Sequence, residues 1–235
     1  MTTSQLMWVG AWKTVATLFG GLLLGILLGN LTFAILPGSR VVDPQIHYAL
    51  IAAVPTLIAL AIGSAAWGRA MARLAGADAS RRMAWAGVLG FVPITLILAF
   101  SLLGLEPIAV ERLGGRFPIH RLFTILFVPT AFLISAVSAW AIGIGLRDKP
   151  LARSLGWRVG LTGGAAFLLL NMVMESAGWV VGAPGAAERA TMITVMSLGN
   201  LAAALAGGAM LGLTLGRRAT VEGHDVRVAS PPATA

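Results

Sequence analysis

Six long apolar stretches constrain this chain more than any other feature of its sequence. A transmembrane helix needs about 20 consecutive apolar residues to cross a hydrocarbon core about 30 Å thick. Each stretch approaches that length almost without charge, and the short connections leave no room for a separate soluble domain. The stretches lie near residues 14–36, 48–68, 83–104, 122–145, 159–181 and 190–216. We therefore expect an all-α fold, a polytopic integral membrane bundle of six transmembrane helices.

The transmembrane domain is expected to span residues 14–216, with a short segment at each end. Residues 1–13 carry two tryptophans beside Lys13, a pattern typical of a segment at the membrane interface. Residues 217–235 include a run of Ala, Ser, Pro and Thr with little to bury, so we expect a mobile tail. The chain is thus predicted to be one bundle with two short flanking segments.

Composition narrows the chemistry available to such a bundle. The chain is 57% hydrophobic and 11% charged and has no cysteine, which excludes disulfides, thiolate metal ligands and thiol nucleophiles. Its histidines, His47, His120 and His224, fall outside the six stretches, so buried bis-histidine haem ligation is not supported. No phosphate-binding, zinc-protease or serine-hydrolase motif occurs. We expect no metal, no cofactor and no catalytic residue, and we favour a non-enzyme.

The basic residues of the connections predict the orientation. Twelve of the seventeen Lys and Arg residues lie in the first segment, the tail, and the connections after the second and fourth stretches. The positive-inside rule therefore places both termini in the cytoplasm of a multi-pass protein, which we expect in a cell membrane of the bacterial inner-membrane type. The net charge of +8 is explained by anionic lipid head groups, so the lipid bilayer is the expected partner and nucleic acid is not.

Small residues recur at four-residue spacing in the first and last apolar stretches. Such a strip lets a second helix approach closely. The strips consist of Gly21, Gly25 and Gly29 in the first stretch and of Ala204, Gly208, Gly212 and Gly216 in the last. The first functional hypothesis is a non-catalytic membrane subunit or accessory protein that packs against other membrane-protein subunits through these faces.

Polar side chains collect at similar depths in three of the expected helices. Glu175 is the only acidic residue inside an apolar stretch, and Asn171 precedes it by one turn on the same helix face. At 1.5 Å per residue, both lie about 20 to 25 Å above Arg158, in the outer half of the membrane. Asn30, Ser197 and Asn200 are placed between that level and mid-membrane. Arg121 is the last residue of the charged outer connection, residues 106–121.

These side chains support an alternative function, a small-solute transporter or solute-binding membrane component with an outward-facing polar pocket around Glu175. A carboxylate in hydrocarbon costs a few kcal/mol, so it normally faces the bundle interior or a wet cavity with a partner. Two roles for Glu175 stay open. It is either a ligand or proton site, or a structural anchor paired with an arginine of the connection 106–121.

Overall fold

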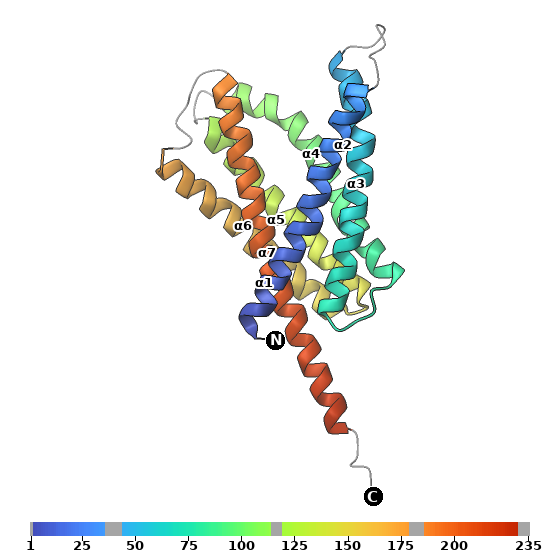
Figure 1. The fold of residues 1–235 in the computed structure, drawn as a ribbon. Coiled ribbons are helices and arrows are strands. Elements are labelled where there is room, and N and C mark those ends of the chain that lie inside the picture. The colour runs from blue at the N-terminus through green and yellow to red at the C-terminus, as the bar shows by residue number, and fades with distance from the viewer. Residues whose placement is uncertain (1, 36–43, 114–118, 179–185, 230–235) are drawn as a thin grey trace, which may run out of the picture.

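The computed structural model of this chain is all-helical over the residues it describes, 2–35, 44–113, 119–178 and 186–229 (Figure 1). Six of the described helical runs are long and apolar enough to cross a membrane, which confirms the predicted number. The elements are α1 (Thr3–Thr14), the π-helical segment η1 (Val15–Phe19), α2 (Gly20–Ile35), α3 (Pro44–Leu74), α4 (Arg81–Leu113), α5 (Ile119–Gly145), α6 (Lys149–Ser176) and α7 (Ala186–Ala229).

The first helical run begins well before residue 14, the expected start of the membrane domain. Thr2 caps α1, because its hydroxyl accepts from the Gln5 backbone N–H at 3.3 Å and the Gln5 side chain accepts from the Thr2 N–H at 2.8 Å. Such a reciprocal capping box satisfies two backbone donors that a helix start leaves free. Leu6 and Ala11 of α1 are buried, so residues of the expected interfacial segment pack within the bundle.

The helices form a ring in which each packs on its neighbours in the chain. α2 packs on α3, α3 on α4, α4 on α5, α5 on α6 and α6 on α7, and α1 closes the ring against α7. Figure 1 shows that the chain begins and α7 emerges at the same end of the bundle, which we call the terminal end. Beyond that end α7 continues as a helix through Ala229, into the region where a mobile tail was expected.

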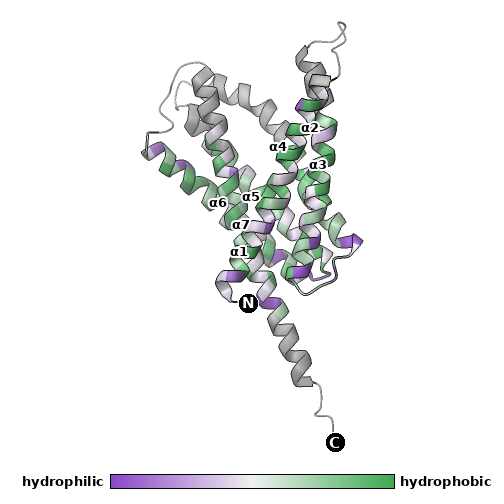
Figure 2. Ribbon diagram, in the orientation of Figure 1, coloured by the Kyte–Doolittle hydropathy of each residue, from purple (hydrophilic) through white to green (hydrophobic). Residues whose placement is uncertain are grey.

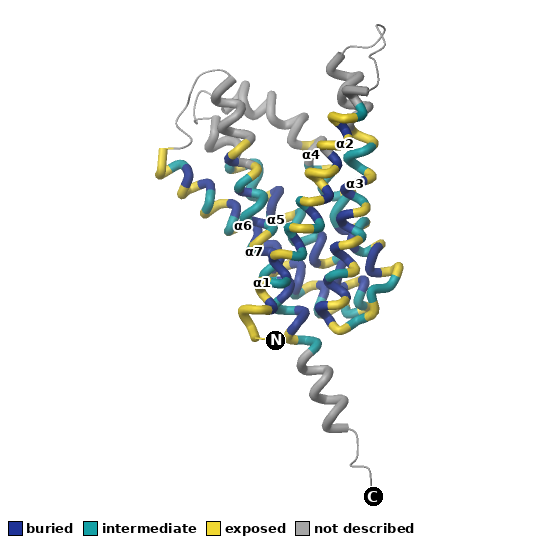
Figure 3. Tube along the Cα trace, viewed as in Figure 1, coloured by how far each residue is buried: buried dark blue, intermediate teal, exposed yellow. Residues whose placement is uncertain are grey.

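Buried side chains are concentrated toward the terminal end (Figure 3). The largest buried cluster draws side chains from η1 and from α3 to α7, among them Trp67, Ile142 and Leu211. The outside of the ring is apolar instead of polar (Figure 2), and Leu23 and Ile62 are each 64% exposed. An apolar exterior suits contact with hydrocarbon, where a soluble protein would present charged residues.

Both strips of small residues pack inside the chain, each on a different helix. A Cβ on Gly21 would lie 3.0 Å from the Ala59 carbonyl oxygen and 3.1 Å from the Gly63 Cα, so this strip faces α3. A Cβ on Gly212 would lie 2.7 Å from the Gly10 Cα, so the last strip faces α1. Of the other members, Gly25 also meets α3, and Gly208 and Gly216 also meet α1. Glycine allows these close crossings because it has no side chain to hold the backbones apart.

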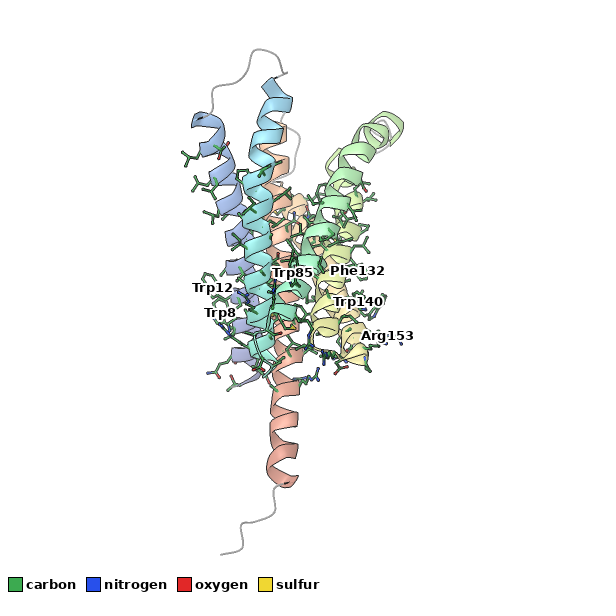
Figure 4. All side chains as sticks on the ribbon, turned by 90° about the vertical axis from the view of Figure 1, so that its right-hand side faces the viewer. Trp8, Trp12, Trp85, Phe132, Trp140 and Arg153 are labelled. Carbon is green, nitrogen blue, oxygen red and sulfur yellow. The ribbon has the colours of Figure 1, made fainter. Side chains whose placement is uncertain are left out.

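Exposed tryptophans surround the lower part of the bundle in Figure 4, toward the terminal end. Trp8 and Trp12 lie on one flank, and Trp140 lies on the other near Arg153. Their exposed fractions are 68%, 59% and 48%. Tryptophan and arginine side chains are typical of the level where a membrane meets water. Trp67 is the exception, since it is only 3% exposed and belongs to the core.

Candidate functional site

The inside of the helix ring holds a pocket of about 540 Å³. This volume falls within the range of about 300 to 1,000 Å³ that is common for small-molecule sites. All six membrane-length helical runs contribute to its wall, from Thr14 on α1 to Leu211 on α7. The pocket therefore belongs to the bundle as a whole and depends on the packing of all six runs.

The pocket is closed toward the terminal end by the buried core. Trp67, Val159 and Leu211 line the pocket and also belong to the large buried cluster. The Trp67 Nε1 donates a hydrogen bond to the Thr14 Oγ1 at 3.1 Å, and Thr14 is 5% exposed. A buried indole N–H needs such an acceptor, so the pair ties α3 to the first helix at the floor of the pocket.

The pocket wall is apolar apart from hydroxyl groups and one amide. Those groups come from Thr14, Thr95, Thr130, Ser135, Ser138, Ser197 and Asn200. Three of the six hydroxyl groups donate to carbonyl oxygens within the protein. Thr95 donates to the Phe91 carbonyl at 2.7 Å, and Thr130 donates to the Leu126 carbonyl at 2.9 Å. Ser138 donates across the helix interface to the Gly90 carbonyl at 3.2 Å.

Ser135 differs from these hydroxyl residues. Within the described part of the chain its hydroxyl makes no hydrogen bond, and its oxygen is not sealed from the pocket. Two glycines make room for it: a Cβ on Gly163 of α6 would lie 3.0 Å from the Ser135 Cβ, and a Cβ on Gly207 of α7 would lie 4.0 Å from its Oγ. Ser135 and Ser197 are therefore the pocket hydroxyl residues that make no hydrogen bond within the described part of the chain, so both can donate to a molecule in the pocket.

The structure brings together two of the six polar residues that the sequence pointed to as a ligand site. Ser197 and Asn200 line the pocket. Asn171 is buried at the α6–α7 contact, where its Nδ2 donates to the Phe167 carbonyl at 2.7 Å and a Cβ on Gly199 would lie 2.9 Å from that Nδ2. Asn171 therefore serves packing between these helices.

The remaining candidates do not line the pocket. Glu175 is half-buried one turn beyond Asn171, and Asn30 is exposed on α2. The side chain of Arg121 lies outside the described residues, as do the other arginines of the connection 106–121, so a pairing of Glu175 with that connection is not tested. This pocket takes most of its few polar groups from α5 and α7, and the predicted role of Glu175 as a ligand residue stays a prediction.

Sequence reasoning passed over the polar residues of α5 and the Thr14–Trp67 pair. Thr130, Ser135 and Ser138 recur within an otherwise apolar stretch, and this recurrence was the available signal. Thr14 and Trp67 lie at the ends of the stretches 14–36 and 48–68, where the sequence pattern indicates an interface residue as readily as a buried one.

No protein-family model, curated protein or solved structure matches this chain. The chemistry of the pocket is the remaining guide to function. None of the described residues that line it is ionisable, so it offers no acid, base or charged ligand group. Such a wall is suited to binding an uncharged molecule without covalent chemistry.

Proposed function

We propose that this chain is a membrane component that binds or carries a small, uncharged and largely apolar molecule. The observation that carries this proposal is the pocket of about 540 Å³ inside the ring, with an apolar wall, a packed floor and a few hydroxyl and amide groups. Apolar walls supply affinity and a few placed polar groups supply orientation in small-molecule sites of this kind. The polar groups that serve here are Ser135, Ser197 and Asn200.

A non-catalytic subunit that packs on other membrane proteins is the second candidate. Its support came from the strips of small residues, and α1 and α3 occupy those strips within this chain. Helix faces already packed at backbone contact are not free for a partner. The pocket is therefore the stronger basis for a function.

The proposed setting is a cell membrane of the bacterial inner-membrane type, crossed six times, with both termini in the cytoplasm. Arg73, Arg82 and Arg158 lie exposed toward the terminal end, near the exposed tryptophans. Basic residues favour the cytoplasmic face. In this orientation the packed floor faces the cytoplasm and the pocket lies on its outer side.

Filling the pocket tests this function. Ala204 lines the pocket and is half-buried. We expect Ala204→Phe to lower the affinity for the apolar dye Nile red about tenfold or more. The reason is that overpacking costs about 1 to 3 kcal/mol. Leu205→Phe, at a residue that is 37% exposed and outside the pocket wall, is the matched control. The measurement is the dye emission titrated against each protein in lipid nanodiscs.

Thermal unfolding of both variants checks that they fold. Dye binding by folded Ala204→Phe that equals the binding by the unsubstituted chain would contradict the proposal, because the dye would then be held by lipid or by the outer surface.

A further inference from the structure

We infer that the pocket is loaded from the hydrocarbon layer of the membrane, through an opening between α2 and α7. The inference rests on the proposed function and adds the class of ligand: a molecule dissolved in the bilayer, with an apolar body and a small hydrogen-bonding group. Three observations carry it, namely the change of partner along the first helix, the exposure of the pocket wall, and the absence of charge at the opening.

The first helix packs on opposite neighbours before and after η1. α1 lies against α7, where a Cβ on Gly10 would lie 2.6 Å from the Gly212 Cα. α2 lies against α3, and the Thr56 hydroxyl donates to the Gly25 carbonyl at 3.2 Å. The change of partner falls at the π-helical segment Val15–Phe19. Such π-helical turns inside α-helices are rare and are frequent at functional sites.

This change of partner separates α2 from α7. No contact joins these two helices among the described residues, although α1 and α7 pack closely. Figure 1 shows the first helical run crossing α7 near the terminal end and then rising beside α3, away from α7. The ring is therefore closed by helix packing at the terminal end and is not closed between α2 and α7 farther along.

The exposed residues of the pocket wall indicate that the opening lies at the separation between α2 and α7. Of the described residues that line the pocket, two are exposed: Leu22 on α2 and Ser197 on α7. They lie one on each side of the separation. On the opposite side of the pocket, Thr130 is 8% exposed and Ala131 is 4% exposed. A pocket whose exposed residues sit on two unpaired helices opens between those helices.

The α2 side of the opening is apolar, and the α7 side presents the uncharged Ser197. Leu23 and Leu27 continue the outer face of α2 and are each 64% exposed, and α2 carries no charged residue. A charged or strongly hydrated solute has no favourable contact along this path. An apolar molecule already in the bilayer reaches it without leaving hydrocarbon, and inside the pocket its polar group can meet the hydroxyls of Ser135 and Ser197, which make no hydrogen bond among the described residues.

The test changes Leu22, at the point where the pocket wall meets the separation between α2 and α7. Leu22→Trp narrows the opening and Leu22→Ala widens it, while Leu23→Trp adds the same bulk one residue away, outside the pocket wall. An obstruction on the route slows association and dissociation together, so we expect both rates to fall about fivefold or more in Leu22→Trp, whereas a lost contact in the pocket wall would change mainly the dissociation rate. We expect both rates to rise in Leu22→Ala and to stay unchanged in Leu23→Trp. The measurement is stopped-flow emission of Nile red with each protein in lipid nanodiscs.

The outcomes separate this inference from the proposed function. Unchanged rates in both Leu22 variants, with dye binding still lost in Ala204→Phe, would overturn the route and leave the pocket as the binding site. Dye binding that survives in folded Ala204→Phe would remove the proposed function itself. Rates that change equally in Leu22→Trp and Leu23→Trp would also overturn the route, because added bulk anywhere on α2 would then have the same effect.

Discussion

Ser135 shows at the scale of one residue how this pocket would discriminate between molecules under the proposed function. In a helix, a serine hydroxyl commonly bonds back to a carbonyl of the preceding turn, as the hydroxyls of Thr95 and Thr130 do here. Among the described residues the Ser135 hydroxyl has no such bond, and it faces the pocket between Gly163 and Gly207. A donor left free in an apolar wall favours a ligand that carries an acceptor.

Ser135→Ala is expected to remove a preference for alcohols over alkanes. Competition with bound Nile red by 1-decanol and by decane in nanodiscs measures that preference. A neutral hydrogen bond contributes about 0.5 to 1.5 kcal/mol, so the preference for decanol should fall about twofold to tenfold, with little change in the free energy of unfolding.

Ser138→Ala is the matched control for Ser135→Ala. The Ser138 hydroxyl also lines the pocket, but it donates to the Gly90 carbonyl of α4. We expect this variant to lose stability and to keep the preference for decanol. An unaltered preference in Ser135→Ala would show that Ser135 does not contact the ligand.

At the scale of the element, the first helical run sets the shape of the pocket. Its two halves pack on opposite sides of the ring, because α1 meets α7 and α2 meets α3. Small residues make both crossings possible, and η1 lies at the point where the run changes partner. The floor of the pocket depends on the first crossing, since Thr14 accepts the Trp67 hydrogen bond just beyond it.

Gly10→Ala is expected to destabilise the bundle by about 1 to 3 kcal/mol, the range typical of overpacking. The new Cβ would meet the Gly208 carbonyl oxygen and would lie 2.8 Å from the Gly212 N, and backbone atoms cannot turn aside as a side chain can. Unfolding by heat or by sodium dodecyl sulfate, followed by circular dichroism, measures the change.

Gly20→Ala provides the control for this prediction. A Cβ on Gly20 meets no atom within 4 Å, so this substitution should be neutral or stabilising by about 0.5 to 1 kcal/mol through helix propensity. If both alanine variants unfold alike, the α1–α7 crossing does not hold the ring closed.

At the scale of the whole molecule, the terminal end is where the described side chains are packed most densely. The terminal end is densely packed and carries exposed basic residues and tryptophans around it. One ion pair lies there as well, since Arg218 of α7 reaches Asp148 at 2.9 Å, and Asp148 also caps α6 by accepting from the Leu151 N–H at 2.8 Å. The pocket lies beyond this packed end, so the orientation in the membrane decides which leaflet it serves.

Single cysteines test the orientation, because the chain has none of its own. Asp78 lies exposed between α3 and α4 at the terminal end, and Ala177 lies exposed after α6 at the other end. With both termini in the cytoplasm, a membrane-impermeant maleimide should label Ala177→Cys in intact cells and should label Asp78→Cys only after the cells are opened. The reverse pattern would invert the proposed orientation.

The number and kind of the helices were readable from the sequence, and the partners of those helices were not. A stretch of apolar residues that matches the thickness of a membrane predicts a helix by itself, whatever surrounds it. The strip around Gly21 likewise predicted a close crossing, but a smooth face fits any helix. Only the tertiary structure assigns α3 to Gly21 and α1 to Gly212.

The candidate site was predicted only in part for a related reason. Counting residues from a basic boundary gives the depth of a side chain, and by depth Asn171 and Asn200 belong together. Depth leaves open which way each helix is turned, and the structure places Asn200 at the pocket and Asn171 in the α6–α7 contact. The sequence by itself determined six apolar helices, since crossing length and missing charge are local properties. The tertiary structure alone decided which polar groups share a pocket, because the rotation of each helix and the course of the first one depend on packing between distant parts of the chain.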